Sequence, residues 1–147
     1  MNIGIDGRFY RREAAGLSTY TQNLLPKLLK VSPHDHFYLF LTPKDAKECT
    51  IAAKNVTKVV VPIAHYTIDE QTKLHTVLAK YPLDCMHFLN FNHPVRYNGP
   101  FIVTIHDLTL LFFSSGSTSF LKEIGYRYVL RDAARRAAKI ITVSDFT

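Results

Sequence analysis

A pair of titratable side chains follows one of the most apolar stretches of this sequence. The segment FIVTI (101–105) consists of apolar and β-branched residues, and His106 and Asp107 come directly after it. A neutral imidazole both donates and accepts hydrogen bonds, so His106 could bind a ligand hydroxyl or act as a general base. Asp107 could orient the imidazole or cap the following turn. The alternative is that His106 only satisfies backbone groups of its own loop. We take His106 and Asp107 as the candidate catalytic residues.

A glycine-bearing loop near the N-terminus suggests a phosphate site. Gly16 directly precedes a segment with leucines at helical spacing (17–30). A glycine lets the backbone approach a ligand closely, and a helix N-terminus offers free N–H groups to a phosphate. The alternative is that Gly16 only supplies a positive φ to a turn. Arg8, in the same loop, could bind phosphate through its guanidinium. Gly16 and Arg8 are therefore predicted substrate-binding residues.

Two further polar residues follow apolar segments. Asn90 comes after DCMHF (84–88), and Ser144 comes after KIITV (139–143). Ligands of open α/β sheets bind outside the carboxyl ends of the strands, so we expect both residues at the same edge as Gly16. Asn90 and Ser144 complete the predicted substrate-binding set, although a capped loop is an equal alternative for Asn90.

Strand-like runs alternate with helical patterns along the chain, which places these residues in a fold. The predicted strands are 2–7, 37–41, 58–61, 84–88, 101–105 and 139–143, and the predicted helices are 17–30, 43–54, 68–80 and 119–139. Several strands are apolar on both faces, as in a parallel sheet covered by helices on both sides. The order predicts an α/β domain with a doubly wound, mostly parallel, Rossmann-like sheet. Pro26 should kink the first helix, because proline removes a backbone hydrogen bond.

The composition bounds the class of protein. The 147 residues fit one globular domain, and no stretch approaches the roughly 18 unbroken apolar residues of a membrane span. No basic leader precedes an apolar block, and Cys49 and Cys85 lack a C-x-x-C spacing, so we expect a cytosolic protein. The net charge of +6 permits an anionic partner such as a nucleotide, a nucleic acid or a lipid surface.

The sequence lacks several motifs that mark particular kinds of catalysis. Neither G-x-x-x-x-G-K-[ST], G-x-G-x-x-G nor G-x-S-x-G occurs, which argues against dinucleotide oxidoreduction and a serine nucleophile. The histidines and cysteines form no zinc-ligand pattern, so we predict no metal. Arg127, Arg131 and Arg135 form a stripe on the last predicted helix, which is either a solvated face or a contact with an anionic membrane.

Three segments resemble the N-terminal half of GT-B glycosyltransferases of the GT4 (group 1) family. They are NIGIDGRF…AAGLSTYTQNLLPKLLK at the start, FIVTIHDLTLL in the middle and RYVLRDAARRAAKIITVSDFT at the end. Members of that family open with a strand, a glycine-bearing loop and a helix, and carry a later strand ending in His-Asp. The resemblance spans essentially the whole chain, and TIHDL followed by ITVSDF is its most specific part.

The resemblance implies a retaining transferase that moves a sugar from a nucleotide-sugar donor to an acceptor hydroxyl, with no cofactor. It implies that Gly16 gives backbone N–H contacts to the donor phosphate and that His106 meets the sugar near the reacting centre. It also implies that Asp107 supports this loop and that Ser144 lies at the edge of the cleft. In such enzymes the donor lies between two Rossmann-like domains, and the first domain shapes the acceptor site.

The sequence departs from the family pattern in two ways. GLSTY lacks the arginine that often follows the glycine, and residues 1–147 contain no second domain with the paired-glutamate motif. We therefore expect an acceptor-side domain that is inactive alone and is completed by a C-terminal half or a second chain. The expected partners are a nucleotide-sugar, a glycan or lipid-linked acceptor and an anionic inner membrane surface.

Two other classes of function remain open at this stage. A stand-alone nucleotide- or carbohydrate-binding module would use the same edge residues without catalysis and would need no second domain. A nucleic-acid binder ranks third, because the aromatic residues form no stacking motif and do not alternate with basic residues.

Overall fold

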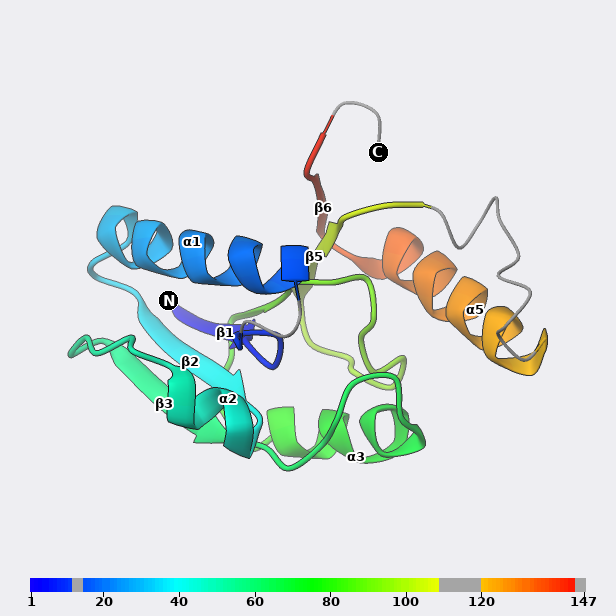
Figure 1. The fold of residues 1–147 in the computed structure, drawn as a ribbon, viewed down its shortest axis with the longest axis horizontal. Helices are drawn as coiled ribbons and strands as arrows, with labels where there is room; N and C mark the ends of the chain where they lie inside the picture. Colours follow the sequence, from blue (N-terminus) through cyan, green and yellow to red (C-terminus); the bar gives the residue numbers. More distant parts are fainter. Residues whose placement is uncertain (12–14, 109–119, 145–147) are drawn as a thin grey trace.

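The computed structural model describes residues 1–11, 15–108 and 120–144 and has an α/β architecture (Figure 1). Its strands are β1 (Asn2–Asp6), β2 (His36–Leu41), β3 (Val56–Val60), β4 (Cys85–Phe88), β5 (Phe101–Ile105) and β6 (Lys139–Thr142). Its helices are α1 (Ala15–Val31), α2 (Pro43–Glu48), α3 (Ile68–Leu78) and α5 (Phe120–Arg136).

All six strands are parallel and lie in the order β3-β2-β1-β4-β5-β6. The chain therefore starts at the centre of the sheet, builds one half outward to β3, and crosses back through α3 to place β4 beside β1. Ile5 pairs with Leu39 on one side and His87 on the other. This arrangement confirms the predicted Rossmann-like doubly wound fold. The direction of winding reverses between β1 and β4, where such sheets bind ligands at the carboxyl ends of their strands.

Helices cover both faces of the sheet. Figure 1 shows α1 and α3 on opposite sides of the strands. On one face Leu25 of α1 packs with Leu39 and Leu41, whereas Phe40 packs on the opposite face in a cluster with Leu74 of α3. This alternation follows from the two-residue period of a strand. Residues of α5 join the α3 cluster, namely Val129, Leu130 and Ala133.

Local signals explain where the helices begin and end. The Thr67 hydroxyl accepts a hydrogen bond from the Glu70 N–H at 3.2 Å and caps α3, and Thr42 caps α2 in the same way. The predicted helix 43–54 ends at Glu48, because Cys49 already has an extended backbone. Helix α1 continues through Pro26 as one element, and the kink stays a prediction.

The β6 strand lies at the sheet edge beside β5, and its side chains are exposed. Ile140 and Ile141 retain 43% and 37% of their accessible surface. None of the helices that the structure describes is both long and apolar enough to cross a lipid bilayer.

Candidate functional site

The carboxyl edge of the sheet carries a cavity of about 650 Å³ between α1 and the end of β5. Gly16 and His106, two of the predicted site residues, both line it. Its walls also include Tyr20, Asn23, Lys27 and Val143. Because all strands run parallel, the loops that follow β1, β5 and β6 emerge at this one edge. The structure thus brings the predicted glycine and histidine together.

His106 is held in place by a backbone carbonyl and an aromatic ring. Its Nε2 donates a hydrogen bond to the carbonyl oxygen of Leu89 at 2.8 Å. The ring of Tyr20 meets the imidazole edge-on, with centroids 4.9 Å apart at an interplanar angle of 88°. Because a carbonyl oxygen only accepts hydrogen bonds, the proton of this contact lies on Nε2. Asp107 follows it in an exposed position.

A chain of buried polar groups lies beneath Tyr20. The hydroxyls of Tyr20 and Thr104 are 3.2 Å apart, and Thr104 Oγ1 lies 2.9 Å from His87 Nε2. Burial lowers the pKa of His87 to about 4, so this imidazole is neutral at physiological pH. These hydrogen bonds connect α1 to β4 and β5. They thereby hold the Tyr20 ring in the position from which it contacts His106.

Gly16 is the second residue of α1, and no acidic residue lies in the first turn of that helix. Among the described glycines none has a positive φ, so the alternative in which Gly16 supplies such a φ is wrong. A Cβ added at Gly16 would meet no atom within 4 Å. Neither backbone conformation nor packing within the described chain therefore demands a glycine here. The missing side chain leaves open space at a helix N-terminus, as a bound phosphate would need.

Ser144 lies just beyond this cavity in the chain. It is exposed and follows Val143, which lines the cavity after β6 ends at Thr142. Ser144 therefore lies at the same sheet edge as Gly16 and His106, and its role in binding stays a prediction.

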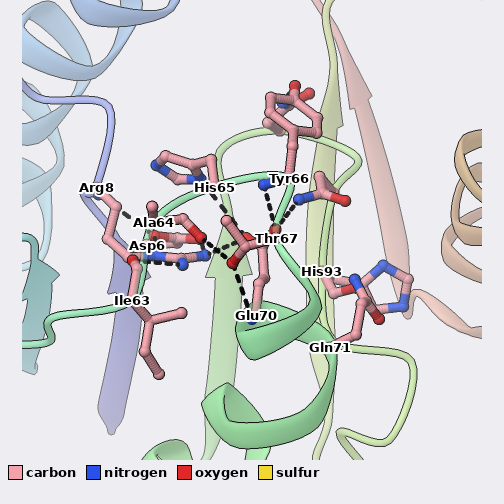
Figure 2. A network of polar contacts seen from close by, with 12 residues as sticks. Asp6, Arg8, Ile63, Ala64, His65, Tyr66, Thr67, Glu70, Gln71 and His93 are labelled. Atoms are coloured by element: carbon pink, nitrogen blue, oxygen red, sulfur yellow. Dashed lines mark hydrogen bonds and ion pairs between the residues drawn. The ribbon is translucent and has the colours of Figure 1, made fainter. Parts of the chain in front are cut away.

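Arg8 lies in a buried ion network rather than in the cavity of Gly16 (Figure 2). Its Nε and Nη2 donate to the two carboxylate oxygens of Asp6 at 2.8 and 2.7 Å. Nη2 also donates to Glu70 at 2.7 Å, and Nη1 donates to the carbonyl of Ile63 at 3.3 Å. The Arg8 side chain has no exposed surface. A phosphate could reach it only by displacing a carboxylate, so the structure gives Arg8 a role in joining β1 to α3.

The electrostatics of this network favour the ionised forms of Asp6 and Arg8. Burial alone would raise the pKa of Asp6, but the adjacent Arg8 guanidinium outweighs burial and lowers this pKa. Burial would likewise lower the pKa of Arg8, and the carboxylates of Asp6 and Glu70 raise it instead. Fully hydrogen-bonded charges of opposite sign are the form in which ionic groups persist in a protein interior.

Asn90 lies at the carboxyl end of β4, as predicted, but its amide group contacts protein groups on the α3 side. Its Nδ2 donates to the Tyr66 hydroxyl at 2.6 Å, and its Oδ1 accepts from the Phe91 N–H at 2.8 Å. Tyr66 is a residue that the sequence reasoning missed. The Thr67-x-x-Glu70 capping pattern could have indicated this turn, because Glu70 Oε2 accepts the Tyr66 N–H at 2.7 Å.

One group of potential metal ligands occurs among the described residues. Single ligand atoms of Asp6, His65 and Glu70 lie within 4.8 Å of one another. The Arg8 guanidinium bonds to both carboxylates of this group, so a positive charge already occupies the position that a metal would take. These residues therefore do not fit a metal ion while Arg8 is in place.

No protein-family model matches this chain, and no curated protein matches it in sequence.

Proposed function

We propose that this chain is the acceptor-side domain of a retaining glycosyltransferase, which moves a sugar from a nucleotide-sugar donor to an acceptor hydroxyl. One observation carries the proposal. Gly16 and His106, which lie far apart in the sequence, line one cavity at the carboxyl edge of a parallel sheet. They are the two positions to which the resemblance assigns the donor phosphate and the transferred sugar.

The walls of the cavity suit such a ligand. The N–H groups at the start of α1 point their positive end toward the space beside Gly16, where phosphate oxygens can accept hydrogen bonds. Asn23 and Lys27 follow on α1 at a spacing of one turn and add polar groups to a mostly apolar wall, and Lys27 adds a positive charge. The His106 imidazole, which lines the same cavity, would lie next to the sugar beside the phosphate.

In this proposal the remaining catalytic groups come from outside residues 1–147. A second domain or chain would grip the nucleotide, and a glycan or lipid-linked acceptor would approach from the open side of the cavity. The net charge of +6 favours docking on an anionic membrane surface at the cytoplasmic face. A donor-dependent transfer signal from the purified chain alone would contradict the need for a second domain.

Ligand titration followed by NMR tests the proposal. We expect UDP-glucose or GDP-mannose to shift the Gly16 amide and the His106 imidazole signals. Gly16→Trp should weaken this binding at least about tenfold, since the added ring has open space and would fill the cavity. His34→Ala, at an exposed site before β2, is the matched control and should leave binding unchanged. Equal affinity of the Gly16→Trp variant and the natural chain would refute the proposed site.

A further inference from the structure

A second cavity, of about 360 Å³, opens between α3 and α5 and is here called the α3–α5 cavity. Its walls include Tyr66, Asn92, Gly125, Tyr126 and Val129. Val129 belongs to the core cluster on the face opposite α1, so this cavity is separate from the one that Gly16 lines. The predicted substrate-binding residues Gly16, Arg8, Asn90 and Ser144 do not line it.

Tyr66 occupies an unusual backbone conformation beside this cavity. Its φ of 57° is positive, and among the described residues other than glycine it is the one case. This region is unfavourable for an aromatic residue. Two hydrogen bonds hold it, from the Tyr66 N–H to Glu70 and from Asn90 to the Tyr66 hydroxyl. A glycine would adopt this backbone conformation without strain. The presence of a tyrosine at this position therefore indicates a role for its side chain.

Two aromatic rings line the cavity. The rings of Tyr66 and Tyr126 meet edge-to-face, with centroids 5.4 Å apart. Tyr66 keeps 44% of its surface exposed although both of its ends are hydrogen-bonded. An exposed ring that is held rigidly can pack against a ligand with little loss of side-chain freedom.

The polar groups in the walls provide one donor and one acceptor. The Tyr66 hydroxyl accepts a bond from Asn90, which leaves its own proton available to donate. The side chain of Asn92 is 97% buried and gives its Nδ2 to Glu70, and within the described chain nothing donates to its Oδ1. The one carboxylate in the walls, Glu70, is already paired with Arg8 at 2.7 Å. Both oxygens of Glu70 accept hydrogen bonds from protein groups, namely Arg8, the Tyr66 N–H and Asn92, so the groups left for a ligand are uncharged.

We propose that the α3–α5 cavity binds an uncharged, hydroxyl-bearing ring, namely a sugar ring, and that Tyr66 is the residue that selects it. The apolar C–H face of such a ring packs on tyrosine rings, while its hydroxyls pair with the Tyr66 hydroxyl and Asn92 Oδ1. An anion would find no cation in these walls. Binding stands on these residues alone, and the assignment of the ring to the acceptor of the transfer reaction rests on the proposed function.

The segment that follows β4 contacts one cavity and lines the other. His106, in the first cavity, bonds to the Leu89 carbonyl, and Asn92, three residues along, lines the second. Between them Asn90 holds Tyr66. A sugar bound in the α3–α5 cavity would therefore be positioned relative to His106 through a short, hydrogen-bonded stretch of backbone.

Titration of the full chain with methyl α-D-glucopyranoside and methyl α-D-mannopyranoside, followed by NMR, tests this inference. We expect at least one of these sugars to shift the amide signals of Tyr66, Asn92 and Gly125, with a dissociation constant on the order of millimolar, as is ordinary for a ligand of this size. Inorganic phosphate serves as the charged probe. Shifts of the same amides by phosphate as large as those caused by the sugar would overturn the assignment to an uncharged ring.

Gly125 provides the sharpest variant. A Cβ added there meets no atom within 4 Å, so Gly125→Trp can place a large side chain at the cavity wall without a clash at the backbone. It should lower sugar affinity at least about tenfold, whereas Gly125→Ala, the matched control, should retain it. Tyr66→Gly removes the ring while relieving the positive φ, and it should abolish the sugar-induced shifts in a folded protein. Unchanged affinity in Gly125→Trp, or no sugar binding by the natural chain, would overturn the proposal.

The same variants separate this proposal from the proposed function. Gly125→Trp should leave nucleotide-sugar binding at Gly16 and His106 unchanged, because Gly125 does not line that cavity. If the natural chain binds the simple sugars but no nucleotide-sugar, the first site is wrong, and if it binds a nucleotide-sugar but neither simple sugar, the second site is wrong.

Discussion

Replacing Arg8 by methionine should destabilise the protein severely, because two buried carboxylates would lose their counter-charge. Asp6 and Glu70 are 3% and 0% exposed, and the Arg8 guanidinium donates two hydrogen bonds to Asp6 and one to Glu70. Removing one partner of a buried ion pair costs about 3–5 kcal/mol. With two carboxylates affected we expect the upper end, about 5 kcal/mol at pH 7. For a chain of this length that lowers the melting temperature by about 15 °C.

Urea unfolding followed by circular dichroism measures this loss directly. Arg135→Met, on the exposed face of α5, is the matched control and should change the unfolding free energy by less than about 0.5 kcal/mol. The double variant Arg8→Met, Glu70→Gln should regain part of the loss, since it carries one buried charge fewer. A double variant no more stable than Arg8→Met would show that the charge of Glu70 is not what makes the single variant unstable.

The pH dependence of the same measurement has a defined sign. The pKa of Asp6 is lowered in the folded protein, so its stabilising contribution is fully present above about pH 4 and is lost as the pH falls through the folded-state pKa. The difference in stability between the natural chain and Arg8→Met should therefore narrow below pH 4. A stability loss under about 1 kcal/mol at pH 7, together with weaker phosphate binding, would refute the structural role and restore Arg8 as a ligand-binding residue.

Two further changes have expected outcomes of their own. Stability should fall by up to about 3 kcal/mol as the pH drops from 6.5 to 4, because burial lowers the pKa of His87 to about 4 and the unfolded state then binds more protons. In His87→Gln, the free energy of unfolding measured in urea should change less between pH 6.5 and 4. An unchanged pH dependence would show that another group causes the loss of stability. Pro26→Ala should raise the melting temperature through a gain of about 1–3 kcal/mol, since it restores a hydrogen bond inside α1. A lower melting temperature would mean that the proline ring contributes packing.

The fold could be predicted because its signals are local and repeated. Apolar runs such as FIVTI become buried parallel strands, and a helical leucine pattern becomes α1. The meeting of Gly16 with His106 also followed from the sequence, since parallel strands deliver their carboxyl ends to one edge. The helix ends were predicted less accurately. The predicted helix 43–54 stops at Glu48, although the composition of the sequence does not change there.

The parts that could not be predicted depend on pairings across the sheet. Arg8 was predicted to bind phosphate although Asp6, only two residues before it, accepts two of its hydrogen bonds, and its other partner, Glu70, lies 62 residues further along the chain. Nothing near Asn90 in the sequence indicates that its amide binds the hydroxyl of Tyr66, 24 residues away. The positive φ of Tyr66 is likewise imposed by hydrogen bonds at both of its ends rather than by its residue type. Long-range polar contacts of this kind decide which candidate residues face a ligand.

A crystal structure of the protein soaked with a nucleotide-sugar tests the proposed function most directly. We expect phosphate oxygens within hydrogen-bonding distance of backbone N–H groups at the start of α1, beside Gly16, and the sugar ring next to the His106 imidazole. A ligand bound at the amino edge of the sheet, or one that leaves the cavity between Gly16 and His106 empty, would contradict the sugar-transfer proposal.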